Sequence, residues 1–185
     1  IFVADIQDSV MLVKYNRPDN SLTVICDDST PKWATSITLL DYSTVAIADK
    51  FGNVSLIRVP EKVLQLENDP SGNRSQWETG YLNGAPHKFE TIASIYVGET
   101  VTRVVKTKFS SSATTDIILY ATLGGGLGVL LPFATREDVD FFSRLEMSLR
   151  QEAPPLCGRD HLAFRSYYHP VKSVVDGDLI EQFLG

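Results

Sequence analysis

The chain has 185 residues, of which 43% are hydrophobic and 22% are charged, and this composition is typical of a globular protein with one sizeable core. Its 17 basic and 23 acidic side chains give a net charge of −6, the wrong sign for a surface that neutralises nucleic-acid phosphates. These values exclude a disordered chain and argue against a stand-alone nucleic-acid-binding protein.

The two cysteines, Cys26 and Cys157, lie far apart in the sequence, and no CxxC pair is present. They therefore predict neither a disulfide framework nor a zinc site built from paired thiolates, and a reducing compartment fits best. The chain opens on Ile1-Phe2-Val3-Ala4, which resembles the middle of a strand. We expect these residues to belong to a longer protein.

A short pattern occurs three times along the chain. It comprises an apolar residue, an alanine, a polar residue, a turn rich in Gly, Ser, Asn or Asp, and an apolar strand, and its alanines are Ala4, Ala48 and Ala121. Each copy predicts a β-hairpin. The first two alanines are 44 residues apart, close to the period of about 40 to 45 residues of a four-stranded propeller blade. The third copy follows after one period plus an insertion.

Further strands are expected between these hairpins, at residues 22–25, 37–40, 92–97 and 101–106, with tight turns at 41–43 and 98–99. The insertion, residues 61–90, carries turn-forming runs at 68–73 and 83–86 and predicts a long exposed loop.

One uncharged stretch, residues 117–135, is about long enough to cross a bilayer as a helix. Gly124-Gly125-Gly126, Gly128 and Pro132 would weaken such a helix, whereas the apolar runs on either side suit two short strands around a turn. The stretch therefore predicts a hairpin and no membrane span.

These elements predict a mainly β fold: an incomplete WD40-like β-propeller of about three blades in residues 1–133. A closed propeller needs about four to eight blades, because each blade covers its neighbours' faces. We therefore expect the remaining blades to come from other parts of a larger propeller.

Residues 134–185 predict a small C-terminal helical appendage. Thr135 is a suitable N-cap with Asp138 as the capping-box acid. A helical apolar face follows, and Pro154-Pro155 ends the helix. That face comprises Val139, Phe142, Leu145 and Leu149. A second short helix is expected from Arg159 to about Tyr168, and Asp178 can cap a last helix after the Asp176-Gly177 turn.

The polar residues of the appendage do not form a convincing catalytic or metal site. Cys157, His161 and His169 lack a fourth ligand and a standard zinc spacing. Asp160, His161 and Ser166 are the residue types of a hydrolase triad, but no nucleophile elbow is present.

Two other motifs have ordinary structural explanations. The glycines at 124–126 lack the Lys-Ser/Thr that follows a phosphate-binding loop. Asp176 and Asp178 suit the cap of a helix better than an acid–base pair. The sequence therefore predicts a protein that is not an enzyme and has no metal, cofactor or small-molecule substrate.

Residues 158–170 mix arginine with aromatic residues, a composition used in protein interfaces and for stacking on nucleic-acid bases. The acidic net charge favours a protein partner. The candidate interface residues are Arg159, His161, Arg165, Tyr167 and Tyr168. The same aromatic residues could instead bury the appendage against the propeller.

The end of the chain resembles a known family. The ending Val175-Asp176-Gly177-Asp178-Leu179-Ile180-Glu181-Gln182-Phe183-Leu184, with Phe164-Arg165-Ser166-Tyr167 upstream, is similar to the tail of large multi-propeller scaffold proteins. That family includes a splicing factor 3b subunit and the large subunits of the damaged-DNA-binding complex and of the cleavage and polyadenylation specificity factor. The resemblance implies a propeller fold.

Other segments resemble the splicing factor 3b branch of this family, and together they cover essentially the whole chain. They are residues 27–28, 39–42, 48–53, 82–85, 97–100 and 154–161. The damaged-DNA-binding branch lacks the run Cys157-Gly158-Arg159-Asp160-His161. Departures from the pattern lie mainly at 61–68 and 110–115, where loops are free to vary.

The resemblance implies a non-catalytic scaffold subunit of the splicing factor 3b complex in the U2 snRNP, acting in branch-site recognition and spliceosome assembly in the nucleus. The implied partners are a helical-repeat large subunit and small companion subunits, with U2 RNA bound indirectly and no membrane. The alternative is a propeller adaptor of a cullin-type ubiquitin ligase.

Overall fold

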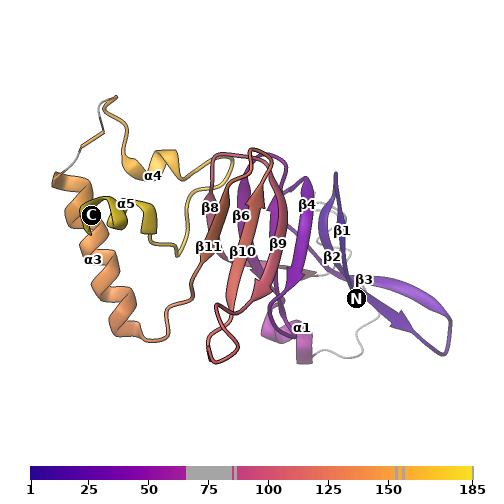
Figure 1. The fold of residues 1–185 in the computed structure, drawn as a ribbon. Coiled ribbons are helices and arrows are strands. Elements are labelled where there is room, and N and C mark those ends of the chain that lie inside the picture. The colour runs from indigo at the N-terminus through magenta and orange to yellow at the C-terminus, as the bar shows by residue number, and fades with distance from the viewer. Residues whose placement is uncertain (66–84, 86, 153, 156, 185) are drawn as a thin grey trace.

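The computed structural model describes residues 1–65, 85, 87–152, 154–155 and 157–184. Three mainly antiparallel sheets stand side by side, and the C-terminal helices gather at one end of the row, with the N-terminus toward the other (Figure 1). The fold is mainly β, and its arrangement is consistent with a fragment of a β-propeller. None of the helices in the described part of the chain is long and apolar enough to cross a membrane.

The first sheet has the order β1-β2-β3-β7 and the second the order β4-β5-β6-β8, whereas the third has three strands in the order β9-β10-β11. The bounds in the first sheet are Phe2–Asp5, Ser9–Asn16, Ser21–Asp27 and His87–Lys88. Those in the second are Ala34–Leu39, Thr44–Asp49, Asn53–Arg58 and Glu90–Tyr96. Those in the third are Val101–Thr107, Ile117–Thr122 and Leu127–Leu130.

All three predicted hairpins are confirmed, and they share one register. Ala4 lies opposite Val10, Ala48 opposite Val54, and Ala121 opposite Leu127, each six residues further along the chain. The repeat in the sequence therefore marks equivalent pairs of strands: β1–β2, β5–β6 and β10–β11. In the complete second sheet, this pair is the second and third of four strands.

The core consists of two apolar layers on either side of the second sheet. Every residue of β5 is buried, because alternate side chains face opposite layers. Val45 and Ile47 pack toward the first sheet, whereas Ala46 and Ala48 pack toward the third. Ala46 and Ala48 are small, and β5 and β9 are in contact across this layer.

The insertion differs from the exposed loop predicted for residues 61–90. It begins with helix α1 (Glu61–Gln65) and ends with β7, and Val63, Ala85 and Phe89 are buried. β7 pairs in parallel with β3 of the first sheet before the chain returns to the second sheet as β8. The predicted turn at 68–73, and most of that at 83–86, lie outside the described residues.

The appendage contains α3 (Arg136–Glu152), α4 (His161–Phe164) and α5 (Gly177–Leu184). The Thr135 cap is confirmed, since its Oγ1 accepts a hydrogen bond from Asp138 N at 3.1 Å. Phe142, Leu145 and Leu149 pack with Leu179 and Ile180 of α5. Val139, expected on this face, is instead exposed at its edge.

The short α4 helix ends earlier than predicted, at Phe164 rather than near Tyr168. The reason is that the following residues leave the helix to pair with β8: the carbonyl of Arg165 accepts a hydrogen bond from Tyr96 N at 2.9 Å. Tertiary pairing therefore overrides the local helical pattern.

Candidate partner interface

The C-terminal segment, residues 165–172, lies along the outer edge of the second sheet. Ser94 N donates to Lys172 O at 3.0 Å, and Lys172 N donates to Ser94 O at 2.9 Å. Because β8 is the outermost strand of its sheet, these bonds satisfy part of an otherwise open edge. The candidate residues Arg165, Tyr167 and Tyr168 therefore lie beside β8, at the edge of the second sheet.

A cluster of charged side chains fixes the base of this segment. Asp176, which is 5% exposed, accepts hydrogen bonds from Arg165 Nε at 2.5 Å and Nη2 at 3.0 Å. Its Oδ2 also lies 2.6 Å from His161 Nε2, and a second carboxylate, Asp178, lies 2.6 Å from Arg165 Nη2. Both His161 and Arg165 therefore have intramolecular partners.

The capping predicted for the pair Asp176 and Asp178 is confirmed for Asp176 alone. Asp176, and not Asp178, accepts the helix amide: Asp178 N donates to Asp176 Oδ1 at 3.1 Å. In addition, Asp176 N donates to Oε1 of the buried Glu146 at 3.0 Å, which joins α5 to α3. Asp176 therefore connects three elements of the appendage, α3, α4 and α5.

This cluster should make the stability of the appendage depend on acid. Burial acts to raise the pKa of the Asp176 carboxyl, but hydrogen bonds from Arg165 and His161 outweigh it, so the pKa lies below its ordinary value. A carboxyl with a lowered folded-state pKa stabilises the fold above its ordinary pKa, and this stabilisation is lost as the pH falls through the folded-state value.

We expect Asp176→Asn to flatten the dependence of stability on pH below about pH 5, measured as denaturant midpoints from pH 7 down to pH 3. The matched control is Asp140→Asn, at an exposed carboxylate on α3. An Asp176→Asn profile as steep as that of the control would contradict this role for Asp176.

Five aromatic rings converge where this segment meets the second sheet, and we call them the aromatic cluster: Trp33, Phe51, Tyr96, Tyr167 and Tyr168. Neighbouring ring centroids lie 5.6 Å apart for Trp33–Phe51, 5.2 Å for Phe51–Tyr168 and 4.6 Å for Tyr168–Tyr167. These tilted and edge-on contacts are the geometries that aromatic pairs prefer.

Much of the aromatic cluster is open to solvent. Tyr168 is 68% exposed, Tyr167 44% and Trp33 38%. The ammonium of Lys50 lies 3.3 Å from the centroid of the Trp33 ring, a cation–π contact. Large rings held in place by one another can form a contact with a partner at low entropic cost.

The structure brings only part of the predicted interface together. Tyr167 and Tyr168 belong to the aromatic cluster, Arg159 is exposed, and His161 and Arg165 pair with Asp176. Trp33 and Phe51 are not among the residues predicted for the interface, and they lie more than one hundred residues earlier in the chain than Tyr167. The sequence does hold one signal for Phe51: it is a large aromatic residue in a turn that otherwise consists of small and polar residues.

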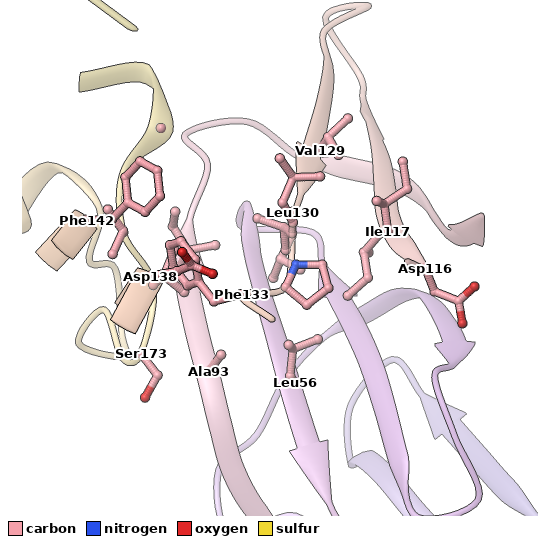
Figure 2. Close-up of a pocket in the computed structure, with 18 of the residues that line it drawn as sticks. Leu56, Ala93, Asp116, Ile117, Val129, Leu130, Phe133, Asp138, Phe142 and Ser173 are labelled. Carbon is pink, nitrogen blue, oxygen red and sulfur yellow. The ribbon is translucent and has the colours of Figure 1, made fainter. Parts of the chain in front are cut away.

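A cavity of about 920 Å³ lies between the third sheet, the second sheet and the appendage. In Figure 2, Phe142 faces it from α3, Ile117 and Leu130 from the third sheet, and Leu56 and Ala93 from the second sheet. Its walls are mostly apolar, with the charged residues Lys106, Asp116, Asp138 and Glu181 among those that line it, so it offers space mainly for hydrophobic groups. Among the residues that the structure describes, no three His, Cys, Asp or Glu side chains are grouped to hold a metal ion.

Comparisons with known proteins identify the family. The model of the family described as "CPSF A subunit region" matches residues 1–185. The chain is 53% identical over 184 residues to "Probable splicing factor 3B subunit 3" of Dictyostelium discoideum and 49% identical over 185 residues to "Splicing factor 3B subunit 3" of Drosophila melanogaster.

It is also 49% identical over 184 residues to "Spliceosome-associated protein 130 A" of Arabidopsis thaliana. These matches cover 99% or 100% of the chain but only 15% of the length of each relative. The match of the family model over every residue shows that the chain belongs to the CPSF A subunit region family.

Proposed function

We propose that the protein is a non-catalytic scaffold subunit of a splicing factor 3b complex, acting in the U2 snRNP in branch-site recognition and spliceosome assembly. The observation that carries the proposal is the identity of about 50% over the whole chain to relatives named as splicing factor 3B subunit 3. The matched relatives named above are all splicing proteins, which favours this function over a ubiquitin-ligase adaptor. The proposed location is the nucleus.

In this proposal, residues 1–133 are the C-terminal blades of a larger propeller and residues 134–185 a helical appendage that carries partner contacts. The partners are other subunits of the splicing factor 3b complex, with U2 RNA bound indirectly. The acidic net charge of the chain supports contacts with proteins rather than with phosphates.

Depletion and add-back in nuclear extract would test this function. Removal of the full-length protein should block assembly of the U2 snRNP on a pre-mRNA, and the purified protein should restore it. An extract that assembles spliceosomes normally after complete depletion would contradict the proposal.

The aromatic cluster is the surface that we propose for a protein partner, with Arg159 nearby in sequence and His161 and Arg165 holding the segment in place. Interface hot spots are enriched in Trp, Tyr and Arg, and the exposed rings of Trp33, Tyr167 and Tyr168 supply two of these types.

We expect Tyr168→Ala in the full-length protein to lower co-purification of other splicing factor 3b subunits at least about tenfold, since a hot-spot residue contributes about 2 kcal/mol or more. Folding should change little, because this ring is largely exposed. The control is Tyr42→Ala, at an 87% exposed residue in the β4–β5 turn. Equal recovery of partners with both variants would remove the aromatic cluster as an interface.

A further inference from the structure

A small polar pocket lies between the second sheet and the C-terminal segment. Its volume is about 140 Å³, the space of about four or five water molecules in the liquid, so it can hold one tetrahedral oxyanion. A ligand bound here would contact distant parts of the chain together. The residues that line the pocket are Lys32 from the β3–β4 connection, Ser55, Thr91 and Ser94 from β6 and β8, and His169, Pro170 and Lys172 from the C-terminal segment.

Hydrogen-bond donors dominate this lining, and no Asp or Glu is part of it. The hydroxyl oxygens of Ser55 and Ser94 lie 3.3 Å apart, and only one of the two hydroxyls can donate to the other. The proton of the second hydroxyl is therefore available to a ligand. Burial lowers the pKa of His169, so at neutral pH its imidazole is uncharged and offers one N–H. Such a set of donors favours an anion.

The two lysines of the pocket differ in how their charge is balanced. Lys32 is 3% exposed, and its ammonium donates a hydrogen bond to Oδ2 of the buried Asp28, which compensates its charge. The ammonium of Lys172 donates to the carbonyl oxygen of Thr91, which is a neutral acceptor. Lys172 therefore supplies a positive charge that no carboxylate of the lining balances.

The pocket has a closed end and an open end. Lys32, Ser55 and Ser94 are buried and form the closed end, whereas Pro170 and Lys172 are exposed. An anion can thus reach the buried hydroxyls from solvent past the ammonium of Lys172, whose charge attracts it.

We propose that this pocket binds one phosphate group, either as free phosphate or as the phosphorylated side chain of a serine or threonine. The ammonium of Lys172 and the free hydroxyl of the Ser55–Ser94 pair donate to its oxygens, and the imidazole of His169 donates a third hydrogen bond. The bound group joins β6 and β8 to the C-terminal segment. It therefore holds the segment that carries Tyr167 and Tyr168 against the second sheet.

Equilibrium dialysis of radiolabelled inorganic phosphate against the purified full-length protein tests the site without any partner. Lys172→Ala should weaken the binding of one phosphate about tenfold or more, because a hydrogen bond to a charged group is lost. The main-chain bonds between positions 172 and 94 remain in this variant. Its matched control is Lys108→Ala, at an exposed lysine outside the pocket. Equal phosphate binding by the two variants, or none by the unchanged protein at millimolar phosphate, would overturn the proposal.

Competition separates the two sources of the phosphate group. The small compound N-acetyl-phosphoserine amide presents the phosphorylated side chain alone. Its displacement of labelled phosphate from the unchanged protein assigns the pocket to a phosphorylated side chain. If it does not displace phosphate whose binding depends on Lys172, the pocket is assigned to free phosphate. Equal displacement by the unphosphorylated N-acetyl-serine amide would show that the phosphate group is not what is recognised, and would overturn the proposal.

Discussion

Gly52→Ala is expected to destabilise the protein by about 2–4 kcal/mol, the sum of backbone strain and a steric clash. Gly52 has a φ of +95°, a conformation that residues with a Cβ rarely adopt. An added Cβ would also lie 2.7 Å from the carbonyl oxygen of Glu99, and backbone cannot move aside as a flexible side chain can. Denaturant unfolding at neutral pH measures the loss.

The repeat supplies a control for this substitution. Gly125, in the equivalent turn of the third hairpin, has a φ of +91° but no atom within 4 Å of an added Cβ. Gly125→Ala should therefore show the strain without the clash, at about 1–2 kcal/mol. Equal losses for the two variants would mean that the close approach of Glu99 to the β5–β6 turn does not contribute.

Asp27→Ala should destabilise the protein by about 3–5 kcal/mol, because it removes the fully buried carboxylate of the ion pair with Lys88. Asp27 is fully buried, and its Oδ1 accepts a hydrogen bond from the ammonium of Lys88. The main chain of Asp27 also bonds to the end of the insertion, since Phe89 N donates a hydrogen bond to Asp27 O at 2.8 Å. The loss should appear in the free energy of unfolding.

Asp116→Ala is the matched control, because it removes a surface carboxylate that pairs with Lys106 at 2.8 Å. Exposed ion pairs contribute little to stability, so this variant should unfold almost as the unchanged protein does. If Asp27→Ala lowered the free energy of unfolding as little as Asp116→Ala, the ion pair between Asp27 and Lys88 would not stabilise the attachment of β7 to the first sheet.

The hairpins could be predicted because each one depends on a local pattern. The turn residues, the alternating strands and the alanine that sets the register all lie within about a dozen residues, and the structure places Ala4, Ala48 and Ala121 equivalently. The long α3 helix was predictable for the same reason, with its cap at Thr135 and its apolar stripe.

The parts that could not be predicted depend on contacts between distant residues. β7 is only two residues long, and it forms because Cys26 and Asp27 of β3 accept it as a neighbour. The early end of α4 depends on Tyr96 in the second sheet. No sequence window that covers one partner contains the other, so local propensity gives no signal.

The same distinction applies to the candidate interface. Tyr167 and Tyr168 can be predicted as interface residues because they lie in a short segment of Arg and aromatic residues. Trp33 and Phe51 come from the ends of strands far away in the sequence and meet them only through the fold. Arg165 and His161 have the residue types of an interface, but the structure gives each an internal partner in Asp176.

Purification of the full-length protein from nuclear extract, with mass spectrometry of its partners and sequencing of bound RNA, tests the central claim most directly. We expect to recover the other subunits of splicing factor 3b together with U2 RNA. Recovery of a cullin and substrate receptors without RNA would contradict it.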